Sequence, residues 1–122
     1  MKIEILVAAH KEFPMPKKEG YLPVLVGAVK NYKPGISYQR DDDGENISSK
    51  NPNYNELTAV YWAWKNLKDV DAIGLVHYRR LLFEKRPYSL DNVISIEKVN
   101  QLLQKYDVIL PKKRNYYIET NY

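Results

Sequence analysis

The stretch Ile3-Glu4-Ile5-Leu6-Val7-Ala8-Ala9 decides the fold class of this chain. It is an almost continuous apolar run with charged or basic residues on both sides. An apolar run of this length without alternation predicts a strand that is buried on both faces, as in parallel sheets. The prolines and lysines of residues 10–20 predict a loop that leaves the carboxyl end of this strand.

Two later segments have the same character. Residues 72–78 predict a second buried strand, and residues 107–111 predict a third, shorter one. Asn53 as N-cap with Glu56 three residues later predicts the start of a helix between the first two strands. Ser95 predicts the start of a second helix. The expected apolar faces are Leu57, Val60, Tyr61, Trp64 and Leu67 in the first helix, and Val99, Leu102, Leu103 and Tyr106 in the second.

This order of strands and helices predicts an α/β domain with a mostly parallel sheet of at least three strands and flanking helices. Residues 21–29 fit a short helix or a strand, and the pattern does not decide between them. Residues 31–53 predict a long loop. Its acidic run is expected to be a solvated turn, although Asp41 and Asp43 also have the spacing of an Asp-x-Asp metal clamp.

Length and composition narrow the function classes. The 122 residues suit one domain, 1–122, and 44% hydrophobic content supports a packed core. The absence of cysteine excludes disulfides, thiolate metal sites and cysteine nucleophiles. A net charge of +4 suits an anionic ligand or lipid headgroups and falls short of a dedicated nucleic-acid binder. Neither a membrane-spanning run nor a signal peptide is visible, so we expect a cytoplasmic protein, placed at the inner face of the membrane if it is peripheral.

Basic residues follow each predicted strand. His10 and Lys11 follow the first strand, residues 77–80 close the second, and Lys112 and Lys113 follow the third. Ligands of open parallel sheets bind outside the carboxyl ends of the strands. Arg79 and Arg80 can each meet phosphate oxygens with two hydrogen bonds, so the pair suits a diphosphate. The alternative is that these arginines only pair with surface acids. The sequence contains no glycine-rich phosphate loop, so it gives no support for an NTPase or a dehydrogenase.

Several motifs in this order resemble one bacterial family. The motifs are Ile3 to Lys11, Tyr21-Leu22-Pro23-Val24, Asn46-Ile47-Ser48, Asn55-Glu56-Leu57-Thr58 with Tyr61-Trp62-Ala63-Trp64-Lys65-Asn66, and Ile73 to Arg80. The family was long catalogued as a domain of unknown function. Its members occur in capsular and exopolysaccharide biosynthesis and are assigned as glycosyltransferases with a GT-A-like, Rossmann-like fold. The resemblance covers essentially the whole chain.

The resemblance implies transfer of a sugar from a nucleotide-diphosphate sugar, plausibly UDP-linked, to a saccharide or lipid-linked saccharide acceptor. It places Ala8, Ala9 and His10 beside the nucleotide base, and it places residues 77–80 where such enzymes usually carry an Asp-x-Asp metal clamp. The expected donor-binding residues are Ala8, Ala9, His10, Lys11, Asn55, Glu56, His77, Tyr78, Arg79, Arg80, Lys112 and Lys113. No metal ligand is assigned; a divalent Mg or Mn ion is a less favoured alternative to the two arginines.

The chain resembles only the N-terminal half of such enzymes, so we expect the nucleotide-sugar-binding part of a truncated glycosyltransferase. Its catalytic residues are not identifiable from the sequence. The exposed apolar surface left by missing helices predicts self-association. Two alternatives stay open: a non-catalytic nucleotide- or glycan-binding module, and an RNA-binding module that uses Lys112, Lys113, Arg114, Tyr116 and Tyr117.

Overall fold

Four parallel strands form the sheet in the computed structural model of the chain, which describes residues 1–110. In sequence order they are β1 (Ile3–Ala9), β2 (Tyr21–Leu25), β3 (Gln39–Arg40) and β4 (Ala72–His77). Their order across the sheet is β3-β2-β1-β4. β1 is therefore paired on both edges, which explains why its sequence is an almost unbroken apolar run.

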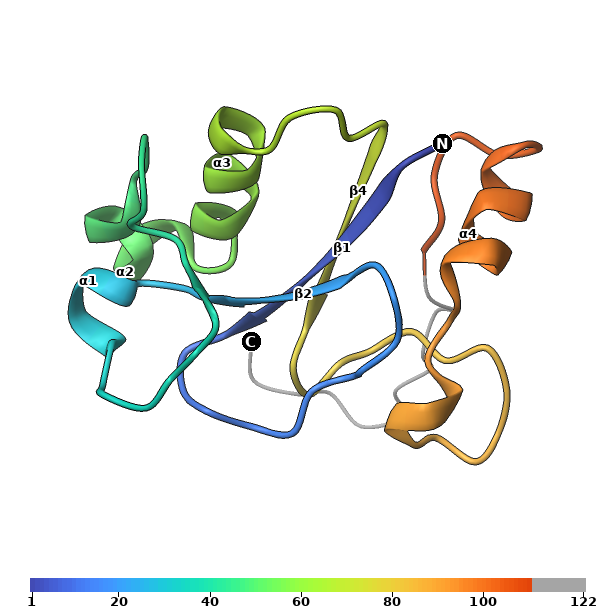
Figure 1. Ribbon diagram of the computed structural model, residues 1–122, viewed down its shortest axis with the longest axis horizontal. Helices are drawn as coiled ribbons and strands as arrows, with labels where there is room; N and C mark the ends of the chain where they lie inside the picture. Colours follow the sequence, from blue (N-terminus) through green and yellow to red (C-terminus); the bar gives the residue numbers. More distant parts are fainter. Residues whose placement is uncertain (111–122) are drawn as a thin grey trace, which may run out of the picture.

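Helices cover both faces of the sheet. The described part of the chain has α1 (Ala28–Asn31), α2 (Asn51–Tyr54), α3 (Leu57–Asn66) and α4 (Ile96–Leu103), with short 3-10 turns η1 (Ser48–Lys50) and η2 (Leu90–Asn92). The larger helices α3 and α4 lie on opposite sides of the strands (Figure 1). The chain is thus a three-layer α/β domain.

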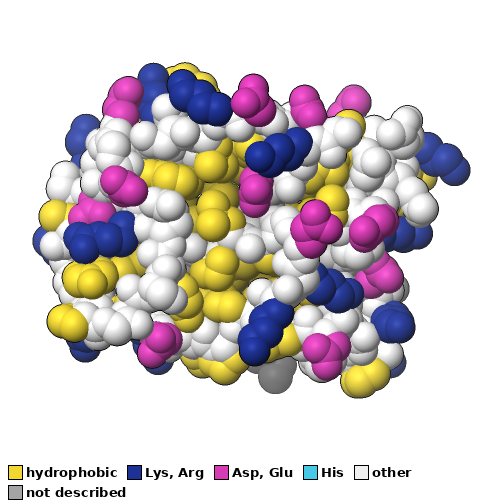
Figure 2. All heavy atoms as spheres, in the orientation of Figure 1, with side chains coloured by type: hydrophobic (Ala, Val, Ile, Leu, Met, Phe, Trp, Pro, Cys, Tyr) yellow, Lys and Arg dark blue, Asp and Glu magenta, His cyan; other side chains and the backbone are white. Residues whose placement is uncertain are grey.

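Alternate residues of β1 supply two separate cores, because successive strand side chains point to opposite faces. The core on the α4 side contains Ile3, Ile5, Val7, Ala9, Val76, Tyr78, Ile94 and Val99. The core on the α3 side contains Leu6, Ala8, Val24, Val26, Ala59, Trp62 and Ala63. On the outside, hydrophobic side chains gather near the centre of one face and charged side chains lie mostly around them (Figure 2).

The fold expected from the sequence is confirmed in its main elements. β1, β4 and the α/β fold with a mostly parallel sheet are as predicted, and α4 begins at Ser95, whose hydroxyl accepts a hydrogen bond from the backbone N–H of Lys98. Residues 21–25 are a strand, which settles the open choice for that segment. The long loop of residues 31–53 contains β3 and short helical turns that its polar composition concealed.

The predicted start of the first helix is wrong. Asn53 lies inside α2, and Asn55 then takes a left-handed backbone conformation with φ of +52°. That residue separates α2 from α3, whose N-cap is Glu56 without a side-chain cap hydrogen bond. The carbonyl of Asn55 accepts hydrogen bonds from the side chain of Asn51 and from the backbone N–H of Thr58, which hold the break in place.

The predicted buried face of this helix is wrong for most of its residues, although Leu67 does pack against the core. The side chains that pack into the core are those of Thr58, Ala59, Trp62 and Ala63. Trp64 is 67% exposed and Leu57 is 56% exposed. The small alanine side chains let α3 approach the sheet closely, so the larger apolar residues are left outside.

The predicted third strand is not formed. Residues 107–110 make no strand, and Pro111 lies outside the described residues. Val108 and Leu110 are 67% and 78% exposed, and Ile109 alone of this run packs against the core. One packed side chain is too little to fix the segment in the sheet. In the described residues, no helix combines the length and apolar character needed to cross a membrane.

Candidate functional site

The carboxyl ends of β1 and β4 form the edge on which the candidate site is built. Ala8 is paired with His77, and the backbone N–H of Tyr78 donates to the Ala8 carbonyl at 3.0 Å. The chain then turns tightly, since the N–H of Arg80 donates back to the His77 carbonyl at 2.8 Å. We call residues 77–80 the arginine turn. It brings four predicted site residues to the end of the β1–β4 strand pair.

Strand alternation sends the first two side chains of the arginine turn to opposite faces. His77 shares its face with Ala8 and Leu75, toward α3, whereas Tyr78 joins the core on the α4 side and is 4% exposed. The ring centroid of Tyr78 lies 5.5 Å from that of His10 and 4.7 Å from that of Phe13. Tyr78 is therefore a packed support for the site, and it has little surface left for a ligand.

Arg79 and Arg80 are exposed at the tip of the turn. The guanidinium carbon of Arg79 lies 5.5 Å from the centre of the Tyr78 ring. Neither arginine makes a salt bridge with an acidic residue among residues 1–110. The contacts within this part of the chain therefore do not support the alternative that the two arginines only pair with surface acids.

His77 makes two polar contacts that reach two different elements. Its Nδ1 accepts a hydrogen bond from the backbone N–H of Arg79 at 3.3 Å, and its Nε2 lies 3.8 Å from Oε1 of Glu56 at the start of α3. Burial lowers the pKa of His77 below its ordinary value of 6.5, although Glu56 raises it; the positive charges of Arg79, His10 and Arg80 lower it further. The lowered pKa favours the neutral imidazole near pH 7, and the contact at Nδ1 favours the tautomer that carries its proton on Nε2, facing the carboxylate.

The other predicted site residues occupy three kinds of position. Ala8 and Ala9 are 0% exposed, so they hold the strand end and offer no surface of their own. His10, Lys11 and Asn55 are exposed near the same sheet edge or the start of α3. Lys112 and Lys113 lie outside the described residues, as do Arg114, Tyr116 and Tyr117. The structure therefore brings together the predicted site residues from the end of β1, the start of α3 and the end of β4.

Asp41 has a structural role. The expectation of a solvated acidic turn is wrong for this residue. Its side chain is fully buried. The carboxylate accepts hydrogen bonds from the backbone N–H groups of Gly27 and Ala28 at 2.8 and 3.0 Å. It also accepts from the hydroxyls of Ser48 and Thr58 at 2.5 and 2.6 Å. Both oxygens are saturated by four donors, so this carboxylate is a structural anchor and is not available as half of an Asp-x-Asp clamp.

One sequence signal could have indicated this anchor. Thr58 stands on the face of α3 that otherwise carries Ala59, Trp62 and Ala63. A hydroxyl on a buried face requires a partner, and a nearby acid is a natural one. Within residues 1–110, no group of three or more His, Asp or Glu side chains is arranged to hold a metal ion.

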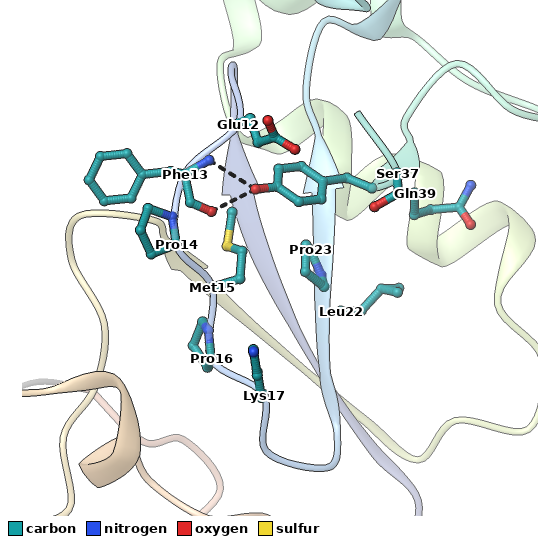
Figure 3. A pocket seen from close by; sticks show the side chains of 11 residues that line it. Glu12, Phe13, Pro14, Met15, Pro16, Lys17, Leu22, Pro23, Ser37 and Gln39 are labelled. Carbon is teal, nitrogen blue, oxygen red and sulfur yellow. Dashed lines mark hydrogen bonds between the residues drawn. The ribbon is translucent and has the colours of Figure 1, made fainter. Parts of the chain in front are cut away.

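An open groove of about 710 Å³ lies beside the loop that follows β1 (Figure 3). It is lined by Glu12, Phe13, Pro14, Met15, Pro16, Lys17, Leu22, Pro23, Ser37, Tyr38 and Gln39. The Tyr38 hydroxyl accepts from the N–H of Phe13 at 2.9 Å and donates to its carbonyl at 2.6 Å. The Phe13 ring points away from the groove in Figure 3 and packs against Tyr78. Tyr38 thereby fixes the loop that carries Lys11 next to the arginine turn.

Comparison with solved structures finds a similar protein. The chain is similar to the apo structure of the WbbM bifunctional glycosyltransferase, with 40% sequence identity and a TM-score of 0.64. The similarity covers 73% of this chain and 16% of the WbbM chain, so this chain spans only a small part of that protein's length. No match is found among curated proteins. The family model described as Domain of unknown function (DUF4422) matches residues 4–122, and the chain therefore belongs to that family.

Proposed function

We propose that this chain is the donor-binding part of a glycosyltransferase and that it binds a nucleotide-diphosphate sugar at the carboxyl edge of β1 and β4. The observation that carries the proposal is the arginine turn. It presents two adjacent, exposed guanidinium groups that have no acidic partner in residues 1–110. The similarity to a glycosyltransferase structure at 40% identity supports the choice of reaction class.

Arg79 and Arg80 would bind the diphosphate with paired N–H donors, which suits the negative charge that develops on a departing nucleoside diphosphate. This role makes a divalent Mg or Mn ion unnecessary for holding the diphosphate. The saturation of Asp41 by four donors supports the same assignment, since that acid has no oxygen left for a metal.

The remaining contacts of the donor follow from the neighbouring elements. Lys11 would add positive charge at the end of β1, and His10 would lie beside the nucleotide base, with Ala8 and Ala9 holding the strand end in place. Asn55 and Glu56 would contact the donor from the start of α3. A UDP-linked donor, an acceptor that is a saccharide or lipid-linked saccharide, and a role in capsular or exopolysaccharide synthesis are parts of the same proposal. Association with the membrane surface would keep the chain close to a lipid-linked acceptor.

Loss of both arginines is the direct test of donor binding. The variant R79M/R80M should lose measurable UDP binding in isothermal titration calorimetry, because two charge-assisted contacts contribute about 3 kcal/mol or more together. The control variant K98M/K105M removes the same charge from exposed positions on or just after α4 and should bind UDP as the unchanged chain does. Equal UDP affinity in R79M/R80M and the unchanged chain would contradict the proposal.

Turnover is a separate question from binding, since a non-catalytic binding module would have the same site. Incubation with a panel of nucleotide sugars, followed by detection of free nucleoside diphosphate, should show transfer or slow hydrolysis for an enzyme. UDP binding without turnover of any donor in the panel would favour the binding module. Binding that falls steeply with salt and accepts any RNA sequence would favour the RNA-binding alternative.

A further inference from the structure

We propose that His77 is a positioning residue that acts as a neutral imidazole and couples the arginine turn to Glu56, so that the site selects diphosphates that carry hydroxyl groups. This inference rests on the proposed donor-binding function and deepens it. It assigns different tasks to the two ring nitrogens, because each faces a different element of the site.

The Nδ1 atom fixes the backbone of the arginine turn. It accepts the N–H of Arg79, while the N–H of Arg80 is taken by the His77 carbonyl. Both backbone donors of the two arginines are therefore satisfied by one residue. A turn fixed at these two points presents its guanidinium groups in a defined direction, which lowers the entropy lost when an anion binds.

The Nε2 atom faces a carboxylate that has no other polar partner among the described residues. Oε1 of Glu56 lies 3.8 Å away, the side chain is 42% exposed, and its carboxylate makes no salt bridge with any other residue there. A carboxylate repels a diphosphate by itself, but it is a strong acceptor for hydroxyl groups. With the imidazole beside it, Glu56 is suited to accept a hydroxyl of the ribose or of the transferred sugar.

Protonation of His77 would disturb its contact with the arginine turn. The charged groups near the imidazole are Glu56 from α3, His10 from the end of β1, and Arg79 and Arg80 from the turn. A proton on Nδ1 would place two donors opposite each other, so the bond to the Arg79 N–H would break. It would also add positive charge beside three basic groups. The neutral form is therefore the one that holds the turn.

Two substitutions separate the two tasks. In His77→Asn the side-chain oxygen can replace the Nδ1 acceptor, and in His77→Gln the amide N–H can replace the Nε2 donor. The probes are UDP, which carries ribose hydroxyls, and inorganic pyrophosphate, which does not. The Asn variant should bind pyrophosphate within about twofold of the unchanged chain, but its preference for UDP over pyrophosphate should fall about tenfold. The variant Glu56→Gln should lose the same preference.

The Gln variant should behave in the opposite way. Both probes should bind about tenfold more weakly, because the turn is no longer fixed, while the preference for UDP over pyrophosphate is kept. Nitrogen-15 NMR of the histidine side chains in the unchanged chain should show Nδ1 without a proton and Nε2 with one. This readout does not depend on any ligand.

The outcomes separate the two proposals. An unchanged chain that binds neither probe overturns the proposed function. Binding of both probes by a chain whose His77 is protonated on Nδ1 overturns the positioning role of His77 alone. If the Asn and Gln substitutions change the affinity for UDP and for pyrophosphate equally, the positioning role of His77 is overturned as well.

Discussion

The carboxyl edge of the sheet has two halves that use charge in opposite ways. At the ends of β2 and β3, the Asp41 carboxylate is fully buried and accepts four hydrogen bonds. At the ends of β1 and β4, the arginine turn presents two exposed cations that no described acid neutralises. The charge of one half is satisfied within the fold, and the charge of the other half is exposed to solvent.

This difference shows that charge in the sequence does not by itself mark a binding site. The acidic run around Asp41 resembles a metal clamp by composition, but its first carboxylate is saturated by Gly27, Ala28, Ser48 and Thr58. Unsatisfied hydrogen-bonding capacity distinguishes a site from an anchor. Substitutions in the first half of the edge should therefore lower the free energy of unfolding strongly. Substitutions in the second half should lower it only weakly.

The largest expected effect is that of Asp41→Asn. The amide would place N–H donors against groups that already donate, so the free energy of unfolding should fall by about 3–5 kcal/mol. Such a loss approaches the whole stability of many domains of this size. The urea midpoint checks it, with Asp42→Asn as control, since the Asp42 side chain lies near the surface and pairs with Arg40. Similar midpoints for the two variants would contradict the anchor.

A smaller loss is expected for Thr58→Val, which keeps the shape of the side chain but removes its hydroxyl. That hydroxyl donates to Asp41 at 2.6 Å and accepts from the Asn51 side chain at 3.1 Å. Leaving one carboxylate oxygen short of a donor should cost about 1–3 kcal/mol. Thr58→Ser retains the hydroxyl and should be more stable than Thr58→Val in the same urea titration. A Val variant as stable as the unchanged chain would contradict the contribution of this hydrogen bond.

The next effect depends on pH and concerns His77. Because its pKa in the folded chain is lowered by burial, the unfolded chain takes up the proton near pH 6.5 and the folded chain only at lower pH. The contribution of His77 to stability is therefore complete above pH 6.5 and is lost as the pH falls through its folded pKa. Urea midpoints measured from about pH 7 to about pH 5 should fall less steeply in His77→Asn than in the unchanged chain. Parallel pH profiles would contradict this assignment.

The smallest effect on stability is expected for R79M/R80M. Both side chains are exposed and make no described salt bridge, so the free energy of unfolding should change by less than about 0.5 kcal/mol. Circular dichroism during thermal unfolding measures it on the protein used for UDP titration. A large destabilisation would mean that the arginines belong to the fold, and the contrast between the two halves of the edge would disappear.

The sequence predicts those parts of the structure that depend on local pattern. The apolar runs of β1 and β4 and the Ser95 cap of α4 are of this kind, and all three are confirmed. The position of the arginine turn follows from strand direction alone, since residues 77–80 come directly after a parallel strand.

The parts that fail depend on contacts between distant segments. α3 has two apolar stripes, and only packing against the sheet determines that Trp62 is inside and Trp64 outside. The burial of Asp41 needs donors that arrive from residues 27, 48 and 58. The approach of Glu56 to His77 joins residues on two elements, and no spacing rule predicts it.

The anchor at Asp41 also bears on the order in which the domain can assemble during synthesis. All its partners lie between Gly27 and Thr58, so they emerge from the ribosome before β4 does. The hydrogen bonds to Asp41 can therefore form early, on a sheet that still lacks its last described strand. The arginine turn emerges afterwards with β4. It then joins a sheet edge at which Asp41 already has its hydrogen-bond donors.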